Sequence, residues 1–526
     1  PENPYLYYLT LALVDQQRVI TARAERFGFR EFTVKDKDFY LNGERIYLFG
    51  ENLPSVRFGG YGASEGQNAK ELAGIMVGFK RQGYNIIRNP HMPIIPLALK
   101  LADEIGMMIY NEWAWSFTNT LDSVEFEQRN LKELEEWVYR DYNYPSVVMW
   151  SCGNEVRYSG NKLTYDLLNK QVTRVRELDR SRRPISSFSG AAYGYGTEKL
   201  DTDVIDLHTY LGLSSPAWTN WEANLESVLE LDKGIYGENG KLNKPFIIWE
   251  CVGYSWGQVY DPNFTLNNID NYASYAEKPT TWALSGGIGF AGTIGLAAAL
   301  DPNRSLKYGR EHYGKRIMEL IRYQHENVQG FAPWFHDYTT SAAALWNQPL
   351  FAGLRDNSGG VPLTNLFAGK SYQQTFFLTN SQEKKFNNLE VKLVIVGLDG
   401  KEKQLKSFSI LELLGWQKQE QTLQFKLPGD LAAGSYQIRL TIFENGKEIS
   451  RNFYDVFVQE QKILTTKIET KKRVALLEAN AEVGVKTKEI LTNLGIQFAE
   501  VADLGKLDNY VVLIIPSTNK PYQLFD

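Results

Sequence analysis

Two glutamates at the ends of short apolar runs are the residues best suited to chemistry. Ser146-Val-Val-Met-Trp-Ser-Cys-Gly-Asn-Glu155 follows a proline, and Lys244-Pro-Phe-Ile-Ile-Trp-Glu250 has the same apolar character. Each run is long enough for a buried strand and too short for a helix. Because the strands of a parallel barrel end at one open mouth, we expect both glutamates on one rim. Two carboxylates there are the minimal equipment for hydrolysing a glycosidic bond.

The chain from Phe39 onward has the pattern that such a rim requires. Strand patterns alternate there with helical patterns, which is typical of βα units around a parallel sheet. Eight strands are predicted, at residues 46–51, 85–88, 107–112, 147–155, 185–189, 204–210, 246–250 and 330–335. Helices are predicted at residues 68–82, 97–105, 126–140, 162–178 and 311–327, where apolar residues recur at spacings of three and four. The sequence therefore predicts a central (β/α)8 TIM barrel over residues 35–350.

Two connections depart from the regular unit. Residues 190–203 have little helical pattern and are expected to form a glycine and tyrosine loop. The connection between Glu250 and Gly330 is long and contains Trp256 and Trp282. A long loop at a barrel mouth commonly shapes the substrate pocket, and a surface insertion is the alternative.

Strand-rich segments flank the predicted barrel. Residues 1–34 are interpreted as the end of an immunoglobulin-like β-sandwich, with strands at 5–13 and 26–34 around a polar turn at 15–18. Residues 360–458 predict a second sandwich, with strands at 371–379, 389–396, 421–427 and 435–444. A charged linker then leads to residues 473–526, whose strand, helix, strand, strand order predicts a partial, flavodoxin-like doubly wound α/β domain.

Composition limits the classes of partner. The formal net charge is −5 over 526 residues and no basic block stands out, so nucleic acid is not expected as a partner. No apolar stretch is long enough to suggest a membrane span. The two cysteines, Cys152 and Cys251, are expected to be buried free thiols. The start at Pro1 has no initiator methionine, signal peptide or lipidation motif, so we expect a truncated chain, and its compartment stays open.

Several motifs, in the same order throughout, resemble glycoside hydrolase family 2. They are Arg26-Phe-Gly-Phe-Arg, Leu41-Asn-Gly-Glu-Arg-Ile, Asn85-Ile-Ile-Arg-Asn-Pro-His-Met-Pro93, Leu101-Ala-Asp-Glu-Ile-Gly, Trp150-Ser-Cys-Gly-Asn-Glu155 and Lys244-Pro-Phe-Ile-Ile-Trp-Glu250. The resemblance covers roughly residues 1 to 345. It implies a retaining hydrolase in which Glu155 is the general acid and base and Glu250 is the nucleophile, and a fragment that lacks the N-terminal sugar-binding domain.

Physical chemistry supports these two roles independently. Retention requires carboxyl groups about 5 Å apart, so that one attacks the anomeric carbon while the other protonates the leaving oxygen. At that separation the charge on Glu250 should keep Glu155 protonated, and esterification of Glu250 would let Glu155 deprotonate water. A helix cap or a structural ion pair is the alternative for either glutamate.

Other residues on the predicted rim are candidates for binding the substrate. The resemblance implies that Asn154 binds the sugar 2-hydroxyl, and a turn is the alternative. Arg88 could hold the nucleophile ionised, or form a structural salt bridge. The remaining candidates, each weighed against simple packing, are His91, Glu112, His208, Tyr210 and Trp334. Tyr210 could donate to Glu250, and Trp334 could stack against an apolar sugar face.

Departures from the family pattern concern the sugar. Trp113-Ala-Trp-Ser after Glu112 differs from the best-known β-galactosidases, and the Asn-x-Lys motif of β-glucuronidases does not follow Trp334. Arg157 could still bind an anionic group. We expect an exo-acting β-galactosidase without metal or redox cofactor. A β-glucuronidase, a β-mannosidase or an inactive carbohydrate-binding protein is the alternative, and a homo-oligomer stays open.

Overall fold

An eight-stranded parallel sheet forms the centre of the molecule. The computed structural model describes residues 2–53, 68–116, 124–190, 198–208, 221–251, 314–333, 342–356, 364–460, 472–477, 482–502 and 509–514. The strands are β6 (Leu48–Asn52), β7 (Ile86–Arg88), β8 (Met108–Glu112), β9 (Val147–Ser151), β10 (Ile185–Ser186), β11 (Ile205–His208), β12 (Phe246–Glu250) and β13 (Gly330–Phe331). Their order is β10-β9-β8-β7-β6-β13-β12-β11, so each of the eight predicted strands takes its place in a TIM barrel.

The barrel is closed between β10 and β11 by individual hydrogen bonds rather than by a strand ladder. The N–H of Asp203 donates to the carbonyl of Ile185 at 2.8 Å, and the N–H of Ser187 donates to Thr202 Oγ1 at 3.1 Å. The two edge strands therefore approach each other through residues that flank them.

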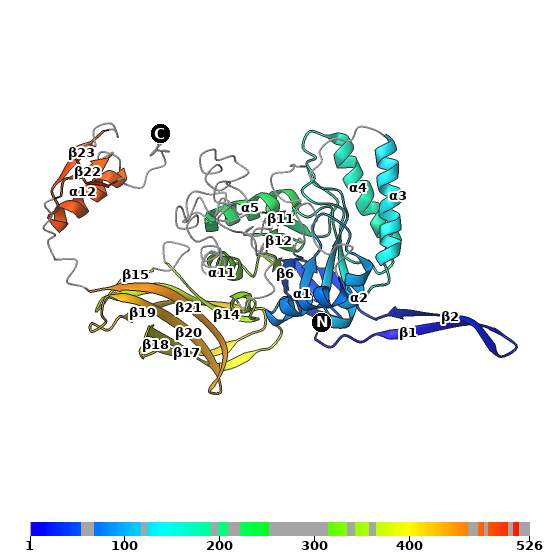
Figure 1. The fold of residues 1–526 in the computed structure, drawn as a ribbon, viewed down its shortest axis with the longest axis horizontal. Helices are drawn as coiled ribbons and strands as arrows, with labels where there is room; N and C mark the ends of the chain where they lie inside the picture. The colour runs from blue at the N-terminus through cyan, green and yellow to red at the C-terminus, as the bar shows by residue number, and fades with distance from the viewer. Residues whose placement is uncertain are drawn as a thin grey trace.

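Helices pack around the sheet, and their buried side chains form an apolar core together with those of the strands and connections (Figure 1). They are α1 (Ala69–Arg81), α2 (Pro96–Ile105), α3 (Val124–Asp141), α4 (Lys162–Leu178), α5 (Trp221–Tyr236) and α11 (Lys315–Tyr323). Asn68 and Asn161 begin α1 and α4, because each side chain accepts a hydrogen bond from the first turn. All five predicted helices are confirmed. The sixth helix of this group, α5, was not predicted.

The barrel interior is a second, separate core. Alternate residues point inward, among them Ile86, Met108, Met149 and Trp249. Gly50 has no side chain because a Cβ there would lie 2.7 Å from the Trp249 ring. At the amino-terminal end of the strands, the meander of β3 (Phe32–Lys35), β4 (Asp38–Leu41) and β5 (Glu44–Ile46) covers this core with two phenylalanines. The polar residues of the barrel strands thus lie at the opposite, carboxyl-terminal end.

The N-terminal strands form a hairpin that extends away from the barrel (Figure 1). β1 (Tyr7–Asp15) pairs with β2 (Arg18–Phe27) around Gln16 and Gln17, whose φ angles are +42° and +73°. Our placement of the second strand at 26–34 was wrong. The turn takes only two residues, which lets the second strand begin at Arg18, and the chain leaves the ribbon after Phe27.

Two sheets after the barrel enclose a common apolar core. One contains β14 (Leu350–Arg355), β16 (Ser371–Asn380) and β19 (Lys418–Lys426). The other contains β15 (Asn365–Phe367), β21 (Lys447–Gln459), β20 (Gly434–Glu444), β17 (Phe386–Gly397) and β18 (Glu402–Leu413). Nearly all neighbouring strands are antiparallel, and side chains from both sheets meet in one cluster. A sandwich after residue 360 is what the sequence predicts, and its immunoglobulin-like topology stays a prediction.

The last described elements form a small parallel sheet with one helix. β22 (Val474–Leu477) lies between β23 (Phe498–Val501) and β24 (Val512–Ile514), with α12 (Glu482–Leu494) between the first two in sequence. The order agrees with the predicted one, and the flavodoxin-like assignment and all four domain boundaries stay predictions. Among the described helices, none is long and apolar enough to cross a membrane.

Candidate active site

Four polar side chains end barrel strands at the carboxyl-terminal mouth. Arg88 ends β7, Glu112 ends β8, His208 ends β11 and Glu250 ends β12. Arg88 and Glu112 each come two residues after a side chain of the barrel interior, Ile86 and Tyr110, and His208 comes four residues after another, Val204. Because side chains alternate along a strand, the three polar groups also point inward. The sequence thus brings them together above one apolar layer.

Arg88 is the centre of the site. Its side chain is fully buried and donates to five acceptors. Nε and Nη2 bind the two oxygens of Glu112 at 2.7 and 3.0 Å, Nη1 binds Glu250 Oε1 at 2.8 Å and Asn52 Oδ1 at 3.1 Å, and Nη2 also binds Asn154 Oδ1. A guanidinium has five N–H groups, so every donor is used. Burial alone would lower the pKa of Arg88, but Glu112 and Glu250 raise it above its ordinary value.

Glu112 lies behind Arg88. Both of its oxygens bind the guanidinium, and Oε1 also accepts a hydrogen bond from the backbone N–H of His91. Burial raises the pKa of Glu112 to about 7, against the opposing effect of Arg88. Glu112 is a candidate for binding sugar hydroxyls, with simple packing as the alternative, and that binding stays a prediction. Both of its oxygens bind groups of the protein, which favours a role in positioning Arg88.

His91 stands in a left-handed backbone conformation, with φ of +68°. This conformation is rare for residues other than glycine, and here it directs the N–H at Glu112. The side chain is half-buried, and His91 follows Arg88 by three residues in sequence. His91 therefore supports the site through its backbone, and hydroxyl binding by its ring stays a prediction.

Glu155 lies beyond the end of its strand. β9 ends at Ser151, four residues earlier than predicted, because the backbone turns through Gly153, where a Cβ would lie 2.5 Å from the carbonyl oxygen of Trp115. Asn154 makes bridges to Ser116 and Ser189 on either side. Glu155 then takes the left-handed region, with φ of +47°. This turn brings its carboxylate back over the mouth.

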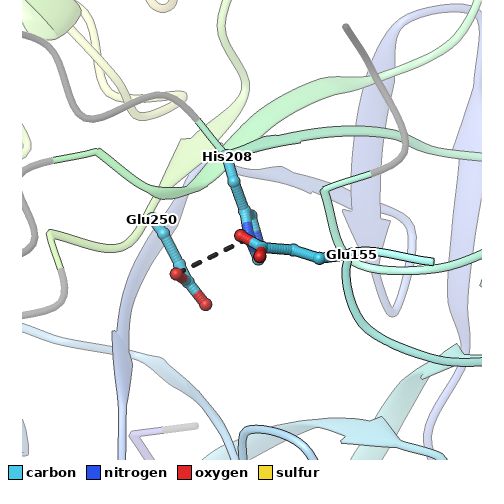
Figure 2. A group of neighbouring side chains, drawn as sticks. All are labelled: Glu155, His208 and Glu250. Carbon is cyan, nitrogen blue, oxygen red and sulfur yellow. Dashed lines mark hydrogen bonds and ion pairs between the residues drawn. The ribbon is translucent and has the colours of Figure 1, made fainter. Parts of the chain in front are cut away.

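Glu155, His208 and Glu250 converge at the mouth from three neighbouring segments of the barrel (Figure 2). His208 Nδ1 lies 2.9 Å from Glu155 Oε1 and 3.6 Å from Glu250 Oε2. One ligand atom from each residue lies within 4.8 Å of the other two, so the two carboxylates are near neighbours. Burial lowers the pKa of His208 to about 3, although the charge of Glu250 opposes this, so the imidazole is neutral at ordinary pH.

The same three residues are the group, within the described part of the chain, that could hold a metal ion. An ion would have to replace two interactions that are already made, the His208 hydrogen bond to Glu155 and the Arg88 ion pair to Glu250. The donor set is therefore satisfied within the protein, and we assign no metal to it. The expectation of no metal or cofactor stays a prediction.

Four polar residues of the site were not predicted. Asn52 ends β6 and joins Arg88 to the backbone of Trp249. Ser189 Oγ and the hydroxyl of Tyr110 both reach Asp206 Oδ2, at 2.7 and 2.9 Å. Asp206 lies in the middle of the apolar run of β11, and this polar residue inside a strand was the available signal.

Some sequence candidates lie outside the described residues. They are Tyr210, Trp334 and residues 252–313 of the long connection after Glu250. Arg157 is described and exposed. Cys152 and Cys251 are buried and free, as expected, and burial raises the pKa of both thiols.

Comparisons with known proteins agree with this arrangement. Residues 32–257 match the model of the glycosyl hydrolases family 2, TIM barrel domain. A putative β-glucuronidase of Formosa agariphila is 30% identical over 225 residues, which are 42% of this chain and 26% of that protein. A β-galactosidase of Staphylococcus xylosus is 28% identical over 290 residues, which are 52% of this chain and 26% of that protein. The matched part thus spans about a quarter of both relatives.

A solved structure supports the fold. The crystal structure of a β-D-mannosidase from Dictyoglomus thermophilum superimposes with a TM-score of 0.61 and 15% identity, over 85% of this chain and 56% of that chain. At this identity the likeness concerns the fold alone. It agrees with the order of the barrel strands and with the two glutamates at the mouth. Residues 32–257 of this chain therefore match, in sequence and in fold, the TIM barrel domain of the glycosyl hydrolases family 2.

Proposed function

We propose that this barrel hydrolyses terminal β-glycosidic bonds with retention of anomeric configuration. The observation that carries the proposal is the approach of the Glu155 and Glu250 carboxylates, whose nearest ligand atoms lie within 4.8 Å. Inverting hydrolases keep their carboxyl groups about 6.5–9.5 Å apart to admit a water, and retaining ones about 5–5.5 Å. The short separation supports direct attack by one carboxylate.

Glu250 is the nucleophile in this proposal. Its side chain is buried, and Arg88 Nη1 holds one oxygen at 2.8 Å. The charge-assisted hydrogen bond from the guanidinium fixes the direction of the carboxylate. Because Glu112 and Asn52 also hold Arg88, the nucleophile is oriented by a rigid network rather than by one flexible contact.

Glu155 is the general acid and then the general base. It is the more exposed of the two glutamates, with a side chain 17% exposed against 3% for Glu250. It protonates the departing oxygen while Glu250 attacks, and it deprotonates the water that later releases the sugar. Once Glu250 is esterified its charge is lost, which favours ionisation of Glu155.

Asn154 is positioned to bind the sugar. Its Oδ1 accepts from Arg88, while its buried Nδ2 has no hydrogen-bond partner among the described residues. A buried donor without a partner is costly unless a ligand supplies an acceptor. This supports a hydrogen bond from Asn154 to a hydroxyl, strengthened as charge develops in the transition state.

The sugar is proposed as β-galactose, with β-glucuronic acid and β-mannose as the alternatives. The test is a panel of nitrophenyl β-galactoside, β-glucuronide, β-mannoside and β-glucoside, with product configuration followed by proton NMR. We expect turnover of one sugar and initial release of the β-anomer. If folded protein hydrolyses none of the four glycosides, the result would contradict the proposal and favour an inactive carbohydrate-binding protein.

Two variants separate the roles. Glu250→Gln should abolish turnover of every substrate, because no attacking carboxylate remains. Glu155→Ala should lose most activity on substrates with a poor leaving group and least on a dinitrophenyl glycoside, which departs without protonation. Glu104→Gln, at an exposed glutamate of α2, is the matched control and should leave turnover unchanged. Full turnover in either active-site variant would show that the roles are assigned wrongly.

A further inference from the structure

A buried chain of hydrogen bonds runs from Glu155 into the barrel. Glu155 Oε1 lies 2.9 Å from His208 Nδ1, His208 Nε2 lies 2.8 Å from Ser189 Oγ, and Ser189 Oγ lies 2.7 Å from Asp206 Oδ2. Ser189 and Asp206 are fully buried, and the His208 side chain is inaccessible. Asp206 lies two residues before His208 on β11, one layer deeper in the barrel.

Close contacts hold the chain in this geometry. Gly190 has no side chain to separate the partners, because a Cβ there would lie 3.0 Å from the His208 ring and 3.3 Å from Glu155 Cγ. The N–H of Ser189 donates to Gly153 O and lies 3.0 Å from Ser151 Oγ. The hydroxyl of Tyr110 donates to Asp206 from the opposite side. Contacts with the rest of the barrel therefore hold the four side chains in place.

A neutral imidazole permits only two complete arrangements of protons along this chain. If Asp206 is ionised, Ser189 donates to it and accepts from Nε2–H, so Nδ1 is an acceptor and Glu155 must carry a proton. If Asp206 is protonated, it donates to Ser189, which donates to Nε2, so Nδ1–H donates to an ionised Glu155. Either arrangement contains one proton for the two carboxyl groups.

We infer that Ser189, His208 and Asp206 form a proton relay through which Glu155 and Asp206 share one proton, and that the charge of Glu250 selects the arrangement. This inference rests on the proposed function, because it deepens the role of Glu155. An ionised Glu250 beside Glu155 favours the arrangement in which Glu155 holds the proton. A neutral, esterified Glu250 favours the arrangement in which Asp206 holds it.

The exchange moves three protons by one place each. Glu155 Oε1–H gives its proton to Nδ1, Nε2–H gives its proton to Ser189 Oγ, and the original Ser189 proton passes to Asp206 Oδ2. Three bonds to hydrogen break and three form, and no proton enters or leaves. The net result is that one negative charge moves from Asp206 to Glu155, while His208 and Ser189 stay neutral.

The electrostatic surroundings suit this exchange. His208 faces Glu155, Glu250 and the charge of Arg88, and burial lowers its pKa to about 3, so it carries no lasting positive charge. Asp206 faces Ser189 and Tyr110, with Arg88 and Glu112 as the nearby charges. Burial raises the pKa of Asp206 to about 8, against hydrogen bonds from Ser189 and Tyr110 and the charge of Arg88. Asp206 is thus able to hold a proton at neutral pH.

The first test reads the tautomer of His208 and needs no turnover. The chain has five histidines, so ¹⁵N-histidine labelling gives few signals, and a His208→Gln sample identifies the one in question. We expect the Nε2–H tautomer in the wild-type protein and the Nδ1–H tautomer in Glu250→Gln, where the nucleophile is neutral. The same tautomer in both proteins would overturn the inference.

The second test follows the pH dependence of kcat/KM on the glycoside that the wild-type enzyme turns over. Sharing of one proton between Glu155 and Asp206 stabilises the state in which the pair holds that proton. The relay therefore raises the pKa at which the pair loses its last proton. Ser189→Ala cuts the relay and should move the alkaline limb to lower pH by about one unit, the effect of about one hydrogen bond. Ser187→Ala is the matched control, because this buried hydroxyl has no partner among the described residues.

The outcomes distinguish the relay from the proposed function. An unchanged alkaline limb in Ser189→Ala, from protein that melts like Ser187→Ala, would refute the relay and leave the glycosidase assignment intact. Absence of turnover in the wild-type protein would refute the function, while the tautomer of His208 would still report on the relay. If Ser189→Ala does not fold, the comparison of wild-type protein with Glu250→Gln decides alone.

Discussion

At the scale of single residues, Arg88 determines the geometry of the site. Its five donors bind two carboxylates and two amides, and it lies in the barrel without exposure to solvent. A planar fork is needed for this, since lysine offers three donors from one point. The bidentate contact with Glu112 fixes the plane of the guanidinium, and that plane directs Nη1 at Glu250.

Replacement of Arg88 by lysine should therefore be costly although the charge is kept. We expect Arg88→Lys to lower kcat/KM by about 100-fold or more, because at least two charge-assisted hydrogen bonds are lost and Glu250 is no longer oriented. Steady-state kinetics on the preferred glycoside measure the effect. Arg174→Lys is the matched control, because Arg174 also binds two glutamates, Glu135 and Glu177, but on the surface of α4. Equal kinetics for the two variants would contradict the role of Arg88.

At the scale of elements, the apolar runs predicted the strands. A strand of a parallel sheet is buried on both faces, so nearly all of its residues are apolar. Glu155 and Glu250 could be found as carboxylates that end such runs. The relay could not, because it joins Ser189, His208 and Asp206 from different segments, and only the closure of the barrel brings them together. The early end of the strand before Glu155 could not be predicted for a similar reason, since Gly153 packs closely against Trp115, which comes from another segment.

Helix α5 is an element that the sequence analysis did not predict. Leu225, Val228 and Leu229 are buried at helical spacing, so a signal was present. Asp232 is also buried on this helix, and neither carboxylate oxygen has a partner among the described residues. A charged residue normally marks the solvent face of a helix, so the pattern of this segment would place Asp232 outside.

The burial of Asp232 should make the stability of the protein depend on pH. Burial raises the pKa of its carboxyl group from 3.8 to about 7. The folded state thus holds the proton that the unfolded chain releases, so this contribution is present below about pH 4 and is lost as the pH rises through 7. Asp232→Asn keeps a neutral group of the same shape. We expect its melting temperature to equal that of the wild type at pH 4 and to exceed it at pH 8.

The control for this prediction is Glu226→Gln, at an exposed position of the same helix. It should shift the melting temperature equally, and little, at both values of pH. A constant difference between Asp232→Asn and the wild type from pH 4 to 8 would show that the carboxyl group is already ionised in the folded state.

At the scale of the whole molecule, α11 joins the barrel to the sandwich that follows it. Lys315 and Glu319 form a buried pair, 3.0 Å apart, and Glu319 accepts from Asn452 of β21. One turn further, the guanidinium of Arg322 lies between aromatic rings of the barrel and of the sandwich. Its donors reach the carbonyls of Trp346 and Gln348 at 2.6 and 2.7 Å. Within the described residues, this buried cation has no carboxylate partner.

Arg322 should therefore make the two units unfold together. Its contacts with the connecting chain and with Thr379 and Ser381 of the sandwich satisfy buried acceptors that would otherwise lack partners. Arg322→Met fills a similar volume without any donor, and the loss should destabilise the junction by about 3 kcal/mol or more, since each buried unsatisfied group costs about 1–3 kcal/mol. In scanning calorimetry we expect one shared transition of barrel and sandwich to split into two. Arg439→Met, at an exposed arginine of β20, should leave the shared transition intact. A single unshifted transition in Arg322→Met would mean that the apolar contacts of α11 join the units without the cation.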